Sequence, residues 1–521
     1  MNCKNENKAL QKQNLIKDKI KNIEYWIMAF FISQPILDIY RCNWGDTISI
    51  AGIAIEEIYN IVFIGGMGIY LLYTWYQKNT WKKSKKYIVY FVLVILYMMA
   101  HYWNITQFNA DILSDEEFNF VIECYYMIRT YLLPILLMFI FYEIGISTVK
   151  FNQIIKWTVF VFASCIVITN LLEISYVTYS LDNKFIEGSI LDWRNLTTQS
   201  DLDAYTSKGW FYSGNQISAL LFAATPIVVK ETLLKANWKN YALLILDIIA
   251  MIMIGTRTSA LGGIMVMAVV ILCTLILVLM KLEKKCKWSS IFVMIGIMIL
   301  GIVVLSKSPI QYKYAEEQRQ QVGEDETRNI DNVLNEEEQN ESLKSLAEYL
   351  DKYGYYYYIN SYFLEVYPPE KDPEFWLNVM QRDVARNINN RTFKIEIAER
   401  VVELNNRNMD KWLGIGYTAN LAYTERDYVF QYYIFGVLGC ILFIGPVFYF
   451  LLASGFRILK RYKTSLNIEN VSIGMSLCCL LTIAYLSGHV FGMQLNMFFM
   501  SLYGAKLLLN TKKSTELIQE I

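Results

Sequence analysis

The chain of 521 residues is short of histidine, proline and net charge. It has two histidines and eight prolines, and its 48 basic residues are matched by 48 acidic ones. A chain without net charge has no overall electrostatic preference for nucleic acid or for an acidic partner. Net charge therefore says nothing about partners, and the placement of charge along the chain carries more information than its sum. We expect no nucleic-acid partner.

The nine cysteines do not follow the spacing of a disulfide framework or of a zinc site. Most lie inside apolar runs, and the longest polar segment contains none. This distribution favours packing cysteines, and we predict neither a metal site nor a cofactor. The cysteines inside apolar runs are Cys165, Cys273, Cys440, Cys478 and Cys479.

Hydrophobic residues make up 55% of the chain and fall in blocks separated by charged segments. Blocks of about 20 apolar residues are the length that crosses a bilayer as a helix. The pattern predicts an all-α polytopic membrane protein with about 12 transmembrane helices. The expected spans are 24–41, 50–76, 87–105, 120–143, 155–178, 212–233, 240–255, 259–281, 288–306, 427–455, 468–488 and 491–509.

Basic residues alternate between the short loops, and this alternation sets the orientation. The basic loops form one set, which we place in the cytoplasm together with both termini. They are Lys4–Lys21, Lys78–Lys86, Lys150–Lys156, Lys230–Lys239, Lys281–Lys287, Arg457–Lys463 and Lys512–Lys513. The expected parts are a cytoplasmic tail (1–23), helices 1–9 (24–306), an external loop (307–426), helices 10–12 (427–509) and a second cytoplasmic tail (510–521).

Two external segments present arginine beside the membrane. The hairpin Gly255–Ser259 joins two apolar runs and carries Arg257. In the long loop, Phe393, Ile397, Val401 and Leu404 recur at helical spacing, so 392–404 is predicted to be an amphipathic helix with Arg391 at its N-terminal end. The apolar face of this helix could lie on the membrane domain. A guanidinium is a natural partner for phosphate because its planar fork donates two parallel hydrogen bonds.

The order of several external motifs resembles the O-antigen ligase-like membrane proteins. The motifs are the Gly-Trp-Phe…Asn stretch Gly209–Asn215, the Thr-Arg hairpin in Gly255–Gly263, the Arg-Thr helix that ends in Gly-x-Gly (Arg391–Gly416), the acidic entry Glu425–Gly439 and a last span pair near His489. Pro35–Asp38 adds a weaker likeness.

This resemblance implies a bacterial glycosyltransferase in the cytoplasmic membrane, multi-pass, with its active site on the outer face. The implied donor is a polyprenyl-diphosphate-linked glycan, the acceptor is another glycan, and no metal is needed. Arg257 and Arg391 would hold the departing diphosphate. Ligases of this family carry a histidine where this chain has Glu425, Arg426 and Asp427. Glu425 or Asp427 is therefore the expected base, and the departure moves the interpretation toward a polymerase.

Further contacts to substrate are predicted for Lys208, Asn215, Arg129, Arg426 and His489, each beside a plainer alternative. Asn215 suits a helix cap as well as a sugar contact. Arg129, six residues after Glu123, suits an internal ion pair as well as donor binding. Two rival functions stay open at this level: a transporter or flippase of lipid-linked glycans, and a non-catalytic assembly protein.

Overall fold

The computed structural model is almost wholly helical, as expected for apolar segments that must satisfy their backbone groups internally. It describes residues 2–45, 49–50, 53–109, 119–180, 182–197, 202–283, 287–312, 346–354, 359, 361–382, 387, 390–417 and 426–519. One antiparallel pair of two-residue strands, β1 (Ser49–Ile50) and β2 (Ile53–Ala54), joins the first two helices.

The first half of the chain forms α1 (Asn2–Trp44), α2 (Ile55–Gln77), η1 (Trp81–Ser84), α3 (Lys85–Ile105), α4 (Phe120–Met127), the π-helical turn η2 (Ile128–Leu132), α5 (Leu133–Ile144), α6 (Thr148–Leu171), η3 (Asp192–Asn195), η4 (Leu202–Tyr205) and α7 (Gly214–Leu234). The second half forms α8 (Trp238–Ile254), α9 (Arg257–Leu279), α10 (Trp288–Leu305), α13 (Leu346–Tyr353), α14 (Ser361–Val366), α15 (Pro373–Gln381), α17 (Asn390–Asn405), α18 (Asp410–Leu413), α19 (Asp427–Phe443), α20 (Gly445–Lys460), α21 (Tyr462–Ser465), α22 (Ile468–Leu486) and α23 (Gln494–Gln519).

Helices occupy all twelve ranges in which spans were predicted. Within the described residues, nine are long and apolar enough to cross a membrane. The other three are α1 and α23, which continue into polar sequence, and α8, which has only 17 residues. The polytopic helical class is confirmed, and the number of twelve spans stays a prediction.

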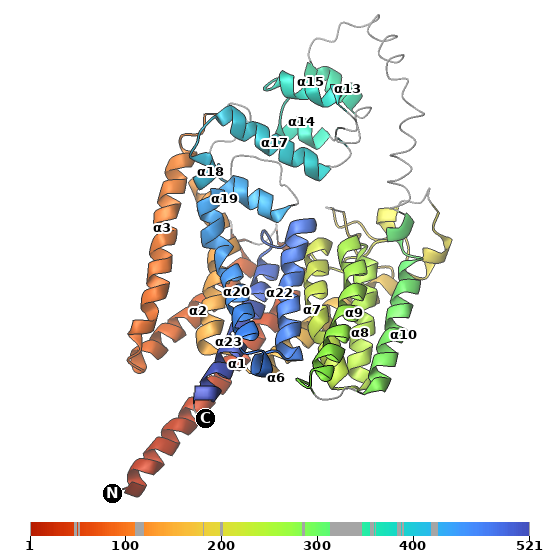
Figure 1. Cartoon of the computed structure of the whole chain (residues 1–521). Helices are drawn as coiled ribbons and strands as arrows, with labels where there is room; N and C mark the ends of the chain where they lie inside the picture. Colours follow the sequence, from red (N-terminus) through yellow and green to blue (C-terminus); the bar gives the residue numbers. More distant parts are fainter. Residues whose placement is uncertain are drawn as a thin grey trace, which may run out of the picture.

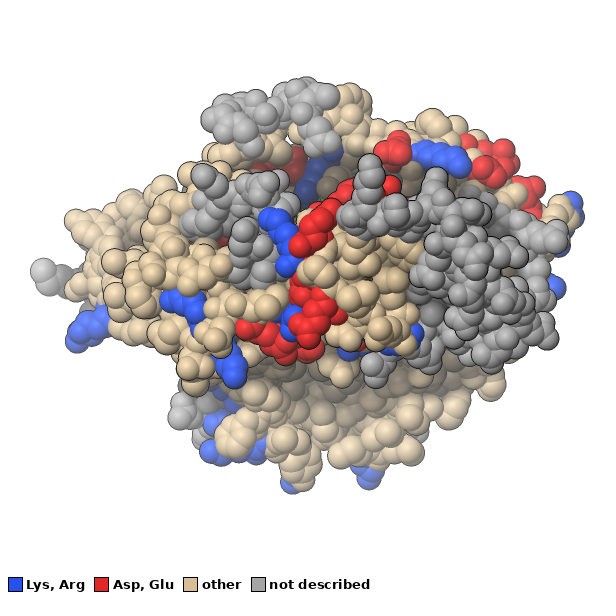
Figure 2. Space-filling view, turned by 90° about the horizontal axis from the view of Figure 1, so that it is seen from above, with Lys and Arg blue, Asp and Glu red and all other residues tan. Residues whose placement is uncertain are grey.

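The long helices stand side by side, with both chain ends at one end of the bundle and α13–α18 at the other (Figure 1). The second end is seen face-on in Figure 2, where acidic and basic side chains lie among one another along the middle of the face. We refer to it below as the loop end. That the loop end faces the cell exterior stays a prediction from the basic loops.

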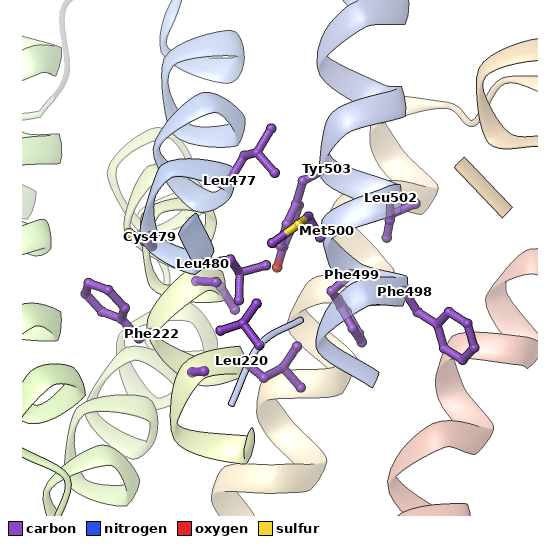
Figure 3. Close-up of a cluster of buried hydrophobic side chains, with 14 of the residues drawn as sticks. Leu220, Phe222, Leu477, Cys479, Leu480, Phe498, Phe499, Met500, Leu502 and Tyr503 are labelled. Atoms are coloured by element: carbon purple, nitrogen blue, oxygen red, sulfur yellow. The ribbon is translucent and has the colours of Figure 1, made fainter. Parts of the chain in front are cut away.

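Helix α7 is the centre of the bundle, and nearly all of its residues are buried. Small residues (Ala219, Ala223 and Ala224) let neighbouring helices approach closely. Figure 3 shows Leu220 and Phe222 of α7 near side chains of α22 and α23. This packing fixes the ends of α7, α22 and α23 relative to one another. Candidate residues lie at these ends.

Helix α19 is broken at Gly436, which has a φ of 63°. The turn Leu413–Tyr417 fills the break: Ile415 N–H donates to the Tyr433 carbonyl (2.9 Å), and Gly416 N–H donates to the Ile434 carbonyl (3.0 Å). The Tyr97 hydroxyl donates to the Phe435 carbonyl at 2.7 Å. Backbone groups freed by the break are thus hydrogen-bonded again, as a broken helix in a membrane requires.

The described residues of the polar loop between α10 and α19 form a small core of their own. Helix α17 forms as predicted, but its apolar face does not lie on the membrane domain. Phe393, Ile397 and Val401 are buried in a cluster with Phe363 and Trp376 from the same loop. Leu404, the fourth residue of the predicted face, is 41% exposed.

The core of this loop should be sensitive to acid through Asp372. Its carboxylate accepts hydrogen bonds from the Arg400 Nε (2.7 Å) and the Tyr367 hydroxyl (2.6 Å). Burial alone would raise the pKa of Asp372, but these hydrogen bonds outweigh burial and hold the pKa below its usual 3.8. A depressed carboxyl pKa stabilises the folded state above the usual pKa, and this stability is lost as pH falls through the folded pKa.

We therefore expect pepsin to cleave near Trp376 readily at about pH 2 and slowly at about pH 5. Asp372→Asn should be cleaved at both pH values, because the amide carries no charge to titrate. Equal cleavage of the wild-type protein at both pH values would contradict this role for Asp372.

Candidate active site at the loop end

Arg257 lies in the first turn of α9, where the sequence predicted a hairpin. Helix α8 ends at Ile254, and Gly255 turns the chain with a φ of 80°. A Cβ at Gly255 would come within 2.5 Å of the Thr206 Cγ2, so both the backbone and the space call for glycine. A cation at the positive end of a helix is unfavourable by itself. The position therefore favours a negatively charged group beside Arg257.

The hairpin is held from two sides. Hydroxyl groups of Thr256, Ser218 of α7 and Ser259 hydrogen-bond to one another. From the segment between α6 and α7, Ser207 N–H donates to the Met253 carbonyl at 2.8 Å. The arginine-bearing turn is thus fixed to the end of the central helix.

Of two predicted substrate contacts beside this hairpin, Lys208 has a local structural role, and Asn215 does not have the predicted role of helix cap. The buried Lys208 ammonium donates to the carbonyls of Ser180 (3.1 Å) and Tyr212 (3.3 Å), and burial lowers the pKa of Lys208. Asn215 lies inside the first turn of α7 and is not its cap. The cap is Ser213, whose hydroxyl accepts from the Gln216 N–H at 3.4 Å.

Arg391 lies in the first turn of α17, and its Nη1 donates to the Leu486 carbonyl at 3.4 Å. Leu486 is the last residue of α22. A residue in a loop more than 100 positions long is thereby returned to the end of the bundle. The prediction that Arg391 heads the amphipathic helix is confirmed, and the contact places it at the same end of the bundle as Arg257.

Asp427 is fully buried at the start of α19. Its carboxylate accepts the backbone N–H groups of His489 (3.0 Å), Val490 (2.7 Å) and Phe491 (2.7 Å). Both oxygens accept backbone hydrogen bonds, and these bonds tie the carboxylate to the loop at His489–Phe491. The geometry therefore favours a structural role for Asp427 over the predicted role of base. Glu425, the alternative base, lies outside the described residues, and Arg426 is exposed.

The loop that Asp427 holds has an uncommon backbone. Gly488 has a φ of 69° and His489 a φ of 62°. Non-glycine residues rarely adopt positive φ, and they keep it only where surrounding contacts enforce it. Here the enforcing contacts are the three hydrogen bonds to Asp427 and one from the Asn496 side chain to the His489 carbonyl (2.9 Å). His489 is partly exposed on this loop, next to the Arg391 contact.

Arg129 forms an ion pair, but its partner is not the predicted one. Its Nε lies 2.5 Å from Glu57 Oε1 of α2. Glu123 instead contacts the His101 Nε2 (2.8 Å) and the Tyr417 N–H (2.7 Å). Arg129 belongs to the π-helical turn η2, and such turns are frequent at functional sites.

Sequence reasoning missed three charged residues beside Arg129. Arg41 closes α1, and Glu56 and Glu57 open α2. The Arg41 Nε lies 3.4 Å from Glu56 Oε1, and its guanidinium lies 4.2 Å from the centre of the Tyr212 ring. Two adjacent carboxylates at the head of an apolar run were the available signal, since such residues are costly near hydrocarbon.

Shared contacts link the separate groups at the loop end. Tyr212 precedes α7, and its ring stacks against the Arg41 guanidinium. Ser218 of the same helix hydrogen-bonds to the Arg257 hairpin. Gln494 opens α23 directly after the loop held by Asp427, and its side chain donates to the Arg129 carbonyl at 3.3 Å. Predicted residues from distant segments therefore lie at one end of the bundle. Among the described residues, no group of three or more metal-ligating side chains is close enough to hold a metal ion.

The model of a family described as "O-antigen ligase like membrane protein" matches residues 17–514, which include every candidate site residue discussed above. None of the curated proteins matches the chain.

Proposed function

The chain belongs to the O-antigen ligase-like membrane protein family, and from this premise we propose that it polymerises or transfers a polyprenyl-diphosphate-linked glycan on the outer face of the cytoplasmic membrane. Membership suggests a role in surface polysaccharide assembly, and such proteins are typically glycosyltransferase-like enzymes. The observation that carries the proposal is the return of Arg391 to the end of the bundle that also presents Arg257.

In the proposed reaction, an acceptor hydroxyl attacks the anomeric carbon of the donor sugar. The bond from that carbon to the diphosphate oxygen breaks, and its electron pair leaves with the diphosphate. Arg257 and Arg391 stabilise this developing charge with charge-assisted hydrogen bonds. The helix ends on which they lie add amide dipoles of the same sign. We favour a polymerase, because Arg426 and Asp427 stand where ligases of the family have a histidine.

The test is chain growth by purified protein in liposomes. The probe is the polyprenyl-diphosphate-linked oligosaccharide extracted from a host strain that lacks this gene, and the product is sized by gel electrophoresis and mass spectrometry. Wild-type protein should lengthen the glycan. Arg257→Ala and Arg391→Ala should each slow growth about 100-fold or more, the usual cost of losing one fixed donor to a developing anion.

Arg194→Ala is the matched control, because Arg194 is an exposed arginine of the segment between α6 and α7. It should leave the rate unchanged. Arg257→Lys and Arg391→Lys keep the charge but lose the planar fork, so only partial activity is expected. Full activity in both alanine variants would exclude the proposed diphosphate clamp.

A flippase is the second candidate, and one observation favours it. Lys230 is fully buried in α7, with its Nζ 2.5 Å from Glu469 Oε2 and 3.1 Å from Asn152 Oδ1. Charged side chains buried among membrane helices are common in transport pathways. The same liposomes separate the two functions: movement of the lipid-linked glycan across the bilayer without chain growth would favour the flippase.

A further inference from the structure

Glu56 is a buried carboxylate that has few hydrogen-bond donors around it. The residue is 5% exposed, and neither of its side-chain oxygens has a hydrogen-bond partner within the described part of the chain. Its contact with Arg41 is an ion pair at 3.4 Å. Its neighbour Glu57, by contrast, is paired with Arg129 at 2.5 Å. A buried carboxylate with so few donors is costly, so a ligand that donates a hydrogen bond to Glu56 would be stabilised here.

The groups around Glu56 suit a carbohydrate. Arg41 lies over one face of Tyr212, which is still 43% exposed. Tyr417 stacks on Tyr126 with ring centres 3.8 Å apart and is 40% exposed. Exposed aromatic surface beside charged hydrogen-bonding groups offers both an apolar face and polar partners to a sugar ring. These groups come from α1, α2, α4 and two loops, so only the folded protein assembles them.

Electrostatic contact joins these groups into one region. Tyr417 lies within electrostatic range of Arg129 and Tyr212, and Arg129 within range of Arg41, Glu56 and Glu57. Tyr212 also adjoins α7, the helix whose Ser218 holds the Arg257 hairpin. Tyr212 and Glu56 thus share Arg41 as a neighbour, and Tyr212 leads into the helix that holds the Arg257 hairpin.

We propose that this region is the acceptor-sugar site and that Glu56 accepts the proton of the attacking hydroxyl. The inference rests on the proposed glycosyltransferase function. It assigns the role of base to Glu56, because Asp427 is poorly placed for that role. The acceptor oxygen bonds to the anomeric carbon, the diphosphate leaves with the electron pair of the broken bond, and the hydroxyl proton passes to the Glu56 carboxylate. Arg41 holds that carboxylate in place as a positioning residue.

The test compares Glu56→Gln with Glu187→Gln in the full-length protein. Glu187 lies in the segment between α6 and α7, and its carboxylate forms an ion pair with Lys184, three residues earlier in the chain. Glu56→Gln should reduce the transfer rate about 100-fold or more, as expected for loss of a general base. Binding of undecaprenyl diphosphate, the donor probe, should stay at the wild-type level because both clamp arginines are intact. Glu187→Gln should match the wild-type protein in both measurements.

Three outcomes overturn the inference while leaving the glycosyltransferase function intact: full transfer by Glu56→Gln, loss of undecaprenyl diphosphate binding in that variant, or an equal loss of transfer in Glu187→Gln. A wild-type protein without transfer activity would instead overturn the function itself. If Glu56→Gln does not accumulate in membranes, Glu56→Asp decides. A lower kcat at unchanged thermal stability and donor binding supports the inference, and an unchanged kcat overturns it.

Discussion

Replacing Gly414 with alanine is expected to prevent the loop end from folding. Gly414 has a φ of 81°, and a Cβ there would lie 2.0 Å from the Ile434 carbonyl oxygen and 2.4 Å from its carbonyl carbon. Neither atom is the end of a flexible side chain, so the turn and the broken helix would have to separate. Separation also removes the hydrogen bonds from Ile415 and Gly416 that fill the break in α19.

Gly436→Ala should have the same effect from the opposite side of the contact. Gly436 has a φ of 63°, and its Cβ would lie 2.4 Å from the Trp412 carbonyl carbon. The measurement is the monodisperse fraction and melting temperature of detergent-solubilised protein, followed by tryptophan fluorescence. Both variants should lose the monodisperse peak or melt far below the wild-type protein.

Gly455→Ala is the control within the same predicted span. Nothing outside its own helix lies within 4 Å of the Cβ position at Gly455, and the residue lies inside α20. Alanine is a better helix former than glycine by roughly 1 kcal/mol. This variant should therefore melt at or slightly above the wild-type temperature. If Gly414→Ala did the same, the proposed pairing of Leu413–Tyr417 with the break would be wrong.

These glycines show where sequence reasoning stops. Hydrophobic periodicity is local, and it predicted helices at all twelve expected ranges and at α17. The motif Gly414-Ile415-Gly416 was recognised as part of a family pattern, but its role depends on a break in α19 about 20 residues later. No local pattern reports that two segments come within van der Waals contact of one another.

The partner of a charged side chain was the second feature that the sequence did not predict. Arg129 was assigned to Glu123 because the two share a predicted helix, whereas the structure pairs it with Glu57 of α2. Which carboxylate meets an arginine depends on which helices are neighbours, and spacing along one helix does not contain that information. For the same reason Asp427 was predicted as a base, although the loop that uses its carboxylate lies some 60 residues further along the chain.

Asp427→Ala is expected to release the loop between α22 and α23. The change leaves the N–H groups of His489, Val490 and Phe491 without their acceptor. An unsatisfied buried polar group costs about 1–3 kcal/mol, so three of them cost several kcal/mol unless the loop opens to solvent. Opening of the loop costs less free energy than leaving these groups buried, because Gly488 and His489 then leave their left-handed conformation. Hydrogen exchange at 488–491 should accelerate strongly, and glycan transfer should fall because Arg391 contacts the adjoining end of α22.

Variants at position 489 separate the fixed backbone from the imidazole. His489→Gly adopts a φ of 62° without steric cost, so hydrogen exchange in the loop should stay slow although the side chain is gone. Asp427→Asn keeps one oxygen that accepts and should give exchange between that of the wild-type protein and that of Asp427→Ala. If Asp427→Ala exchanged as slowly as the wild-type protein, its carboxylate would not be what holds the loop. Fast exchange in Asp427→Ala together with slow exchange in His489→Gly would place the constraint in the backbone amides, which is where the hydrogen bonds lie.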